Sequence, residues 1–211
     1  MIIYQKRKSL KLLKYNKKIH NRLNLSIKDY KEYSETYSSI EIETTPVTGK
    51  YGRFINIDEN NKLYYHIYFN DNKKEIKNKY KINKKDKVTK IKIIMDYQIK
   101  SFNKLFHNCK CIESINFKKF YRNNITDMSC MFRGCSSLKE LNLNNFNTNN
   151  VTDMSFMFDG CSSLKELNLK NFNTNNVTDM RYMFSGCSYD LKREIKSENK
   201  NIKDEAFFND E

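Results

Sequence analysis

Residues 135–160 read CSSLKELNLNNFNTNNVTDMSFMFDG, and residues 161–186 read CSSLKELNLKNFNTNNVTDMRYMFSG. These two segments are identical at 22 of 26 positions, and residues 109–134 match the second segment at 12 of 26. A period of this length is typical of proteins built from stacked repeats, so the repeat decides the fold class. The same register is marked by cysteines at 26-residue intervals: Cys109, Cys135, Cys161 and Cys187.

Each repeat contains a segment with the alternation of a short strand, LKELNL in the second repeat. There Leu141 and Leu143 fall on one face, and Glu140 and Asn142 fall on the other. The leucine face is expected to be buried, and the polar face is expected to meet solvent.

A turn follows in the second half of each repeat. Thr152 and Asp153 are suitable capping residues for a short helix, MSFMF, and Gly160 stands where a left-handed residue is needed after it. Gly134 and Gly186 occupy the same position, and Asn108 replaces them in the degenerate preceding repeat. Asparagine is the next most tolerant residue in that conformation, which supports the register.

About nine apolar positions per repeat cannot form a core within one repeat, so neighbouring repeats must share one. The sequence therefore predicts a solenoid of 26-residue coils with parallel strands and short helices. The run C-S-S-L-K-E-L-N-L followed by F-N-T, N-V-T-D-M and M-F-x-G resembles the BspA-like leucine-rich-repeat proteins, a family of surface proteins, over residues 100–188. That resemblance implies an α+β fold with a leucine-rich-repeat solenoid, no catalysis, adhesion or protein binding, and a surface location.

Three parts of the chain are expected. Residues 1–86 would form a basic helical hairpin over 6–35 and a small β module, which together cap the repeats. In that module, segments 54–57 and 63–69 are predicted to pair as a hairpin, and 88–96 reads as a strand of the entry cap. Residues 87–188 would be the solenoid, and residues 189–211 a C-terminal helical cap.

Charge is distributed unevenly along the chain. Residues 1–100 hold 24 Lys and Arg against 11 Asp and Glu, whereas residues 101–211 hold 15 against 14. This asymmetry suggests contact with nucleic acid, anionic lipid or an acidic partner, and residues 6–31 would be the attachment segment for nucleic acid or anionic lipid. A solvated basic face, with lysine favoured by AT-rich codons, is the competing interpretation.

The sequence offers little for catalysis, because it has three histidines, no tryptophan and no phosphate-binding glycine loop. The recurring Asp127, Asp153 and Asp179 indicate a structural position rather than a catalytic pair. We therefore expect no enzyme activity, no cofactor and no metal site. No apolar run is long enough for a membrane span, and the N-terminus lacks the apolar core of a signal peptide, so a cytoplasmic location is expected.

The repeated cysteines and the asparagines in glycosylation sequons can each have either a structural role or a chemical one. The repeated cysteines could form disulfides, or zinc could bind near His107 and Cys109, but buried free thiols that pack as small apolar groups fit the period better. Asn150 and Asn176 lie in glycosylation sequons, yet bonding to backbone groups at the turn is the favoured interpretation.

The predicted function is protein–protein interaction through the exposed strand face. An F-box-like adaptor and electrostatic attachment through residues 6–31 are the alternatives. The partner-binding residues predicted on the strand face are Glu113, Asn116, Lys139, Glu140, Asn142, Asn144, Lys165, Glu166, Asn168 and Lys170.

Overall fold

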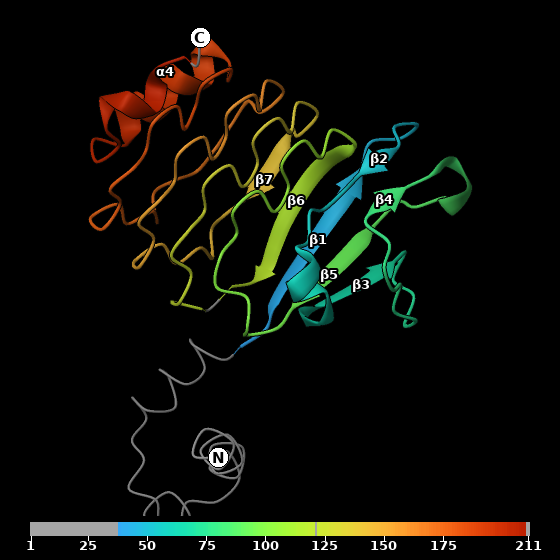
Figure 1. Ribbon diagram of the computed structural model, residues 1–211. Coiled ribbons are helices and arrows are strands. Elements are labelled where there is room, and N and C mark those ends of the chain that lie inside the picture. The colour runs from blue at the N-terminus through green and yellow to red at the C-terminus, as the bar shows by residue number, and fades with distance from the viewer. Residues whose placement is uncertain (1–37, 121, 210–211) are drawn as a thin grey trace, which may run out of the picture.

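The computed structural model describes residues 38–120 and 122–209 (Figure 1). A five-stranded mixed sheet in the order β3-β5-β1-β6-β7 forms its centre, and β2 and β4 form a separate two-stranded sheet. The elements are β1 (Ile40–Pro46), β2 (Gly52–Arg53), η1 (Glu59–Tyr64), β3 (Tyr65–Phe69), β4 (Lys81–Ile82), η2 (Lys84–Asp86), β5 (Ile91–Met95), β6 (Ile112–Lys119), β7 (Glu140–Asn142), α4 (Tyr189–Glu198) and η3 (Asp204–Phe207).

Strand β1 joins the sequence before the repeats to the repeats themselves. It pairs antiparallel with β5 on one side and with β6 on the other. Ile40 and Ile42 are fully buried, while Glu41 and Glu43 alternate with them on the other face. Lysines of the neighbouring strands pair with these two carboxylates, Lys92 and Lys119 with Glu41, and Lys90 and Lys118 with Glu43.

The predicted leucine-rich-repeat solenoid is wrong. Three of the four strand pairings in the main sheet are antiparallel, and only β6 and β7 pair in parallel. Among the described residues, the repeats supply only these two strands, and residues 164–169 form none although their sequence, LKELNL, is that of 138–143. The physical reason is that β1 intervenes, so β5 and β6 meet it as antiparallel neighbours instead of continuing a parallel stack.

Equivalent residues of neighbouring repeats nevertheless lie side by side. Isolated parallel bridges join Ser101 to Asp127, Asp127 to Asp153, and Asp153 to Asp179. The buried rings of Phe106, Phe132, Phe158 and Phe184 stack with centroids 5.5 to 5.7 Å apart. Apolar burial between repeats, as the sequence pattern requires, therefore accounts for much of the core.

The expected helix at MSFMF is also wrong, because this segment forms consecutive turns. The backbone N–H groups of Met154 and Phe156 donate to carbonyls of the next repeat, at Asp179 and Arg181. An α-helix would direct these donors along its own axis instead. Left-handed backbone at Phe156 (φ 55°) is one further departure from helical geometry, and its equivalents Cys130 and Tyr182 share it.

The predicted left-handed position at the end of each turn is confirmed. Gly134, Gly160 and Gly186 have φ values of 72°, 70° and 64°, and Asn108 has a φ of 56°. The backbone N–H of Gly160 donates to the carbonyl of Ser185 at 2.8 Å, so this turn also contributes to the contact between repeats.

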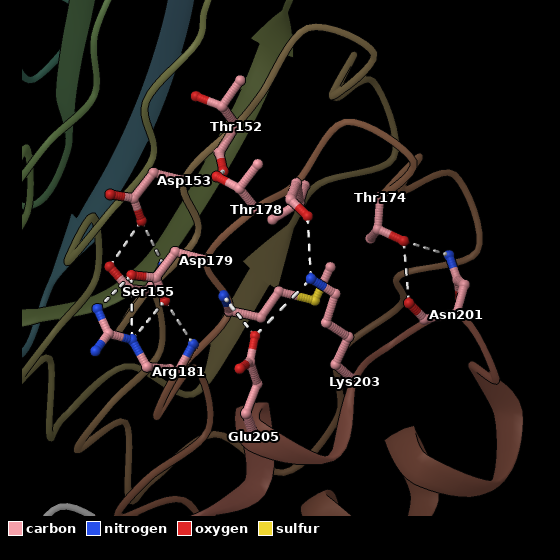
Figure 2. Close-up of polar contacts among 12 residues, drawn as sticks. Thr152, Asp153, Ser155, Thr174, Thr178, Asp179, Arg181, Asn201, Lys203 and Glu205 are labelled. Atoms are coloured by element: carbon pink, nitrogen blue, oxygen red, sulfur yellow. Dashed lines mark hydrogen bonds and ion pairs between the residues drawn. The ribbon is translucent and has the colours of Figure 1, made fainter.

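The C-terminal segment covers the last repeat. Phe184 and Tyr182 donate their N–H groups to the carbonyls of Ala206 and Glu205, which replace the carbonyls of a following repeat. Thr174 Oγ1 donates to the carbonyl of Asn201 at 3.1 Å (Figure 2). Helix α4 begins at the N-cap Ser188 and buries Leu191 and Ile195.

The module before the repeats differs from its predicted hairpin. Strand β3 pairs with β5, and β2 pairs with β4, so segments 54–57 and 63–69 are not hairpin partners. The intervening polar sequence starts η1 at Glu59, with Asp58 as a side-chain cap that accepts from the N–H of Asn60. The predicted helices over 6–35 lie outside the described residues.

A fully buried arginine lies at the junction between this module and the repeats. Arg122 donates from Nη1 to the carbonyl of Asp96 at 2.8 Å and from Nη2 to the carbonyl of Ile99. Burial lowers the pKa of Arg122 to about 10. The side chain thus donates to two carbonyls of the turn after β5, and the Asp96 carbonyl also accepts from the backbone N–H of Ile99 at 3.3 Å.

No helix in the two described ranges is long and apolar enough to cross a lipid bilayer.

Candidate binding surface beside β7

The structure gathers most of the predicted binding residues around one hollow of about 480 Å³. We call it the β7 groove, because residues of β7 line it together with residues 114–116 of β6 and the equivalent residues of the next repeat, 166–168. Seven of the ten predicted residues line it: Asn116, Lys139, Glu140, Asn142, Asn144, Glu166 and Asn168.

The other three predicted residues lie close by. Lys165 lines a second hollow of about 800 Å³, which shares Lys139 with the β7 groove and extends to Ser188 and Asp190. Glu113 accepts a hydrogen bond from Lys139 at 2.6 Å, and Lys170 is exposed and donates its backbone N–H to the side chain of Asn168.

The groove exists because the main sheet ends at β7. Within the described chain, no backbone hydrogen bond joins β7 to residues 165–168. The turns of the same two repeats, by contrast, are joined by several, for example from Met154 N to Asp179 O at 2.9 Å. The two repeats are therefore bonded through their backbone at the turns but only through side chains near their strand segments, for example from Asn168 Nδ2 to Asn144 Oδ1 at 3.4 Å, so β7 is an edge strand of the sheet.

Two leucines that the sequence pattern assigned to the core pack against it but also line the groove. Leu141 and Leu167 are only partly buried, whereas Leu143 and Leu169 are 2% exposed. Together with Ile115, they are the apolar residues among the otherwise polar side chains that line the groove. Sequence reasoning missed them because a leucine at strand spacing predicts burial, and nothing in the sequence signals that β7 has no outer neighbour.

Charge around the groove is only partly neutralised. The hydrogen bond to Glu113 raises the pKa of Lys139, so this lysine is held as a cation in a local pair. Glu140 and Glu166 are exposed, and neither forms an ion pair with any described residue. These two carboxylates remain available to a cationic group of a bound molecule.

The asparagines on the groove mostly organise local backbone. The side-chain oxygens of Asn142 and Asn168 accept from the N–H groups of Asn144 and Lys170, at 3.0 and 3.1 Å. At the other corner of the repeat, Asn150 and Asn176 donate to the carbonyls of Asn123 and Asn149, both at 2.6 Å. The predicted turn role of Asn150 and Asn176 is confirmed.

The cysteines pack in the core, as the sequence suggested. All six cysteines have free, buried thiols. The thiols of Cys135, Cys161 and Cys187 donate to the carbonyls of Phe106, Phe132 and Phe158, at 2.9, 3.2 and 3.2 Å. Burial raises the pKa of both Cys135 and Cys187 to about 12, so these thiols stay protonated and poorly nucleophilic.

A small cluster of titratable groups around His66 was not singled out from the sequence. His66 lies between Glu75 and Asp96, with Nδ1 3.1 Å from Glu75 Oε1 and Nε2 3.4 Å from Asp96 Oδ2. Across residues 38–120 and 122–209, no three or more His, Cys, Asp and Glu side chains are placed to hold a metal ion.

The architecture defines a class of protein in which near-identical 26-residue repeats pack through their turns against a mixed sheet. A family described as "Mycoplasma protein of unknown function, DUF285" matches residues 100–209, and the chain belongs to this family. The matched region spans the repeats, the β7 groove and α4. Neither the search of curated proteins nor the search of solved structures finds a match.

Proposed function

We propose that this chain is a non-enzymatic protein-interaction module that holds an extended segment of a partner protein in the β7 groove. The observation that carries the proposal is the open sheet edge beside β7, which is lined by seven of the ten residues selected from the sequence. The likeness to BspA-like proteins, which implies protein binding, stays a prediction that agrees with this role.

An extended partner suits the groove for two reasons. A sheet edge offers unpaired main-chain groups, and proteins commonly bind extended peptides by adding a strand to such an edge. Leu141 and Leu167 line the same hollow, so apolar side chains at alternate positions of the peptide would have a place to pack.

The exposed charges refine the chemistry of the partner. Glu140 and Glu166 have no ion-pair partner among the described residues, whereas Lys139 is paired with Glu113. We expect the bound segment to carry Lys or Arg beside its apolar residues, because opposite charges steer association and suppress wrong partners.

The proposal can be tested by photo-crosslinking from defined positions. A photoreactive phenylalanine analogue would replace Asn142 in the full chain, and Asn175, an exposed asparagine at the opposite corner of the repeat, would be the matched control. Irradiation in extracts of the native cell should give a discrete adduct from position 142 alone. Equal adducts from both positions, or none from 142, would contradict the proposal.

Charge reversal gives a second test on the captured partner. Glu140→Lys with Glu166→Lys should weaken capture at least about tenfold, because two favourable contacts become repulsive. Glu194→Lys with Glu198→Lys changes the net charge equally on the exposed side of α4 and should leave capture unchanged. Attachment through residues 6–31, an adaptor role and a cytoplasmic location stay predictions.

A further inference from the structure

A second surface, distant in sequence from the repeats, concentrates positive charge. Residues 70–90 contain nine lysines and three acidic residues. Ion pairs account for only two of these lysines: Lys79 pairs with Asp86, and Lys90 pairs with Glu43 and Asp71. The seven others have no ion-pair partner within the described residues and are exposed: Lys73, Lys74, Lys77, Lys81, Lys84, Lys85 and Lys87.

This pattern differs from that of the main sheet. On β1, Glu41 and Glu43 neutralise lysines that come from β5 and β6 and their flanks. A lysine-rich composition alone therefore does not leave lysines unpaired throughout the molecule. Exposed lysines such as Lys100 and Lys110 also lack an ion-pair partner among the described residues, but residues 70–90 concentrate the excess, with nine lysines against three acidic residues.

The two-stranded sheet gives part of this charge a defined geometry. In β2 and β4, Arg53 lies directly opposite Lys81, and Gly52 lies opposite Ile82. Because residues directly opposite each other on paired antiparallel strands point to the same side, Arg53 and Lys81 share one face, and Tyr51 immediately precedes β2. Ile82 is buried on the other face, whereas Arg53 and Lys81 are exposed and Tyr51 is 50% exposed.

Further exposed polar and basic residues follow β4 directly in the chain. Asn83 follows β4 and is exposed, and Lys84 and Lys85 form the first two residues of η2. Asp86, the one acidic residue of η2, is bound by Lys79, and its other oxygen accepts from the N–H of Asn83 at 2.6 Å. We call the resulting surface the basic face, and it comprises Tyr51, Arg53, Lys81, Asn83, Lys84 and Lys85.

Two features of the basic face point to its ligand. Like charges directly opposite each other on paired strands are destabilising, and a bound anion would relieve the repulsion between Arg53 and Lys81. An exposed tyrosine next in the chain to a strand with cationic side chains offers a ring on which a base can stack and nearby groups that can bind phosphates. We propose that the basic face binds single-stranded nucleic acid, with Tyr51 as the stacking platform and Arg53 and Lys81 on the phosphates.

The test uses the full chain and a fluorescent oligouridine of about 12 nucleotides, within the usual site size of such proteins. Binding would be followed by fluorescence anisotropy over a series of salt concentrations. Tyr51→Ala should weaken binding at least about fivefold, and Tyr51→Phe should keep wild-type affinity, because stacking needs the ring and not the hydroxyl.

Charge reversal tests the phosphate contacts. Arg53→Glu with Lys81→Glu should weaken binding at least about tenfold and reduce the slope of log affinity against log salt by about 1.4, for two lost contacts to a single strand. Lys100→Glu with Lys110→Glu removes the same charge from exposed positions outside the basic face and should have a much smaller effect. If the first pair fails to fold by circular dichroism, Lys81→Gln replaces it.

Three results would overturn the proposal. The first is no oligonucleotide binding by the wild-type chain, and the second is an equal loss from both charge-reversal pairs. The third is binding to phosphatidylserine vesicles but not to the oligonucleotide. In that case Leu63, which is 84% exposed, would be the residue to substitute next, because it could insert into a membrane.

Discussion

Phe132 and Phe158, which lie 26 residues apart in the sequence, stack with their ring centroids 5.6 Å apart and their planes 6° from parallel. The same contact continues from Phe158 to Phe184 at 5.5 Å. A stacked column of identical residues means that each ring is buried by its equivalents in the neighbouring repeats. The repeats therefore depend on one another for stability.

The first prediction concerns this column. Phe158→Ala should lower the free energy of unfolding by about 3–5 kcal/mol, because it removes a fully buried ring with neighbours on both sides. Phe156→Ala, two residues earlier at a partly exposed position, should cost less than half as much. Urea unfolding followed by circular dichroism measures both. Equal losses would show that the column is not the core.

The second prediction separates the two leucine positions of one strand segment. Leu169 is 2% exposed, so Leu169→Ala should cost about 2–5 kcal/mol. Leu167 is partly exposed at the β7 groove, so Leu167→Ala should cost clearly less in the same unfolding assay. A larger cost at Leu167 than at Leu169 would mean that the groove is closed.

The third prediction is a pH dependence. The pKa of Cys135 and of Cys187 is about 12 in the folded chain, against an ordinary value near 9.0, because burial disfavours the thiolate. Above pH 9 the unfolded chain loses these protons while the folded chain keeps them. Their contribution to stability is therefore complete below pH 9 and is lost as pH rises from 9 to 12.

Each of these thiols should steepen the loss of unfolding free energy by about 1.4 kcal/mol per pH unit in that window. Lysines and tyrosines titrate there as well, so the informative quantity is the difference between wild type and a Cys135→Ala, Cys187→Ala variant. The variant should show the shallower dependence between pH 9 and 10.5. Parallel curves would contradict the buried, neutral state of the thiols.

The fourth prediction compares two glycines with left-handed backbone. A Cβ at Gly49 (φ 78°) would meet nothing within 4 Å, whereas a Cβ at Gly186 (φ 64°) would lie 3.1 Å from the Cα of Gly160. Gly49→Ala should cost about 1–2 kcal/mol from backbone strain alone. Gly186→Ala should cost more, because it also forces neighbouring repeats apart, and thermal unfolding of both variants measures the difference.

The repeat period, the buried apolar residues and the left-handed glycine positions could be predicted because they depend on residues within each repeat. Strand pairing could not be predicted. Residues 138–143 and 164–169 have the same sequence, LKELNL, yet only the first contains a strand, since β6 lies beside it. The position of β1 between β5 and β6 likewise depends on long-range packing, which local alternation does not encode.

The candidate site was predicted in part for the same reason. Exposed polar residues such as Glu140 and Asn142 follow from alternation, and the structure gathers them with most of the predicted set at one groove. The partial exposure of Leu141 and Leu167 depends on the absence of a partner strand, so the sequence gives no sign of it. Arg53 and Lys81 come together through β2–β4 pairing, which was not predicted either.

Amide hydrogen exchange on the full chain tests the open edge beside β7 most directly. The N–H groups of Met154, Phe156 and Phe158 donate to the next repeat, whereas those of residues 165–168 have no backbone acceptor in the described chain. We predict that the amides of residues 165–168 exchange at least about 100-fold faster than those three, because unbonded amides near the surface need no opening of the fold. Equally slow exchange in both segments would show that β7 has a hydrogen-bonded neighbour and would contradict the proposed binding groove.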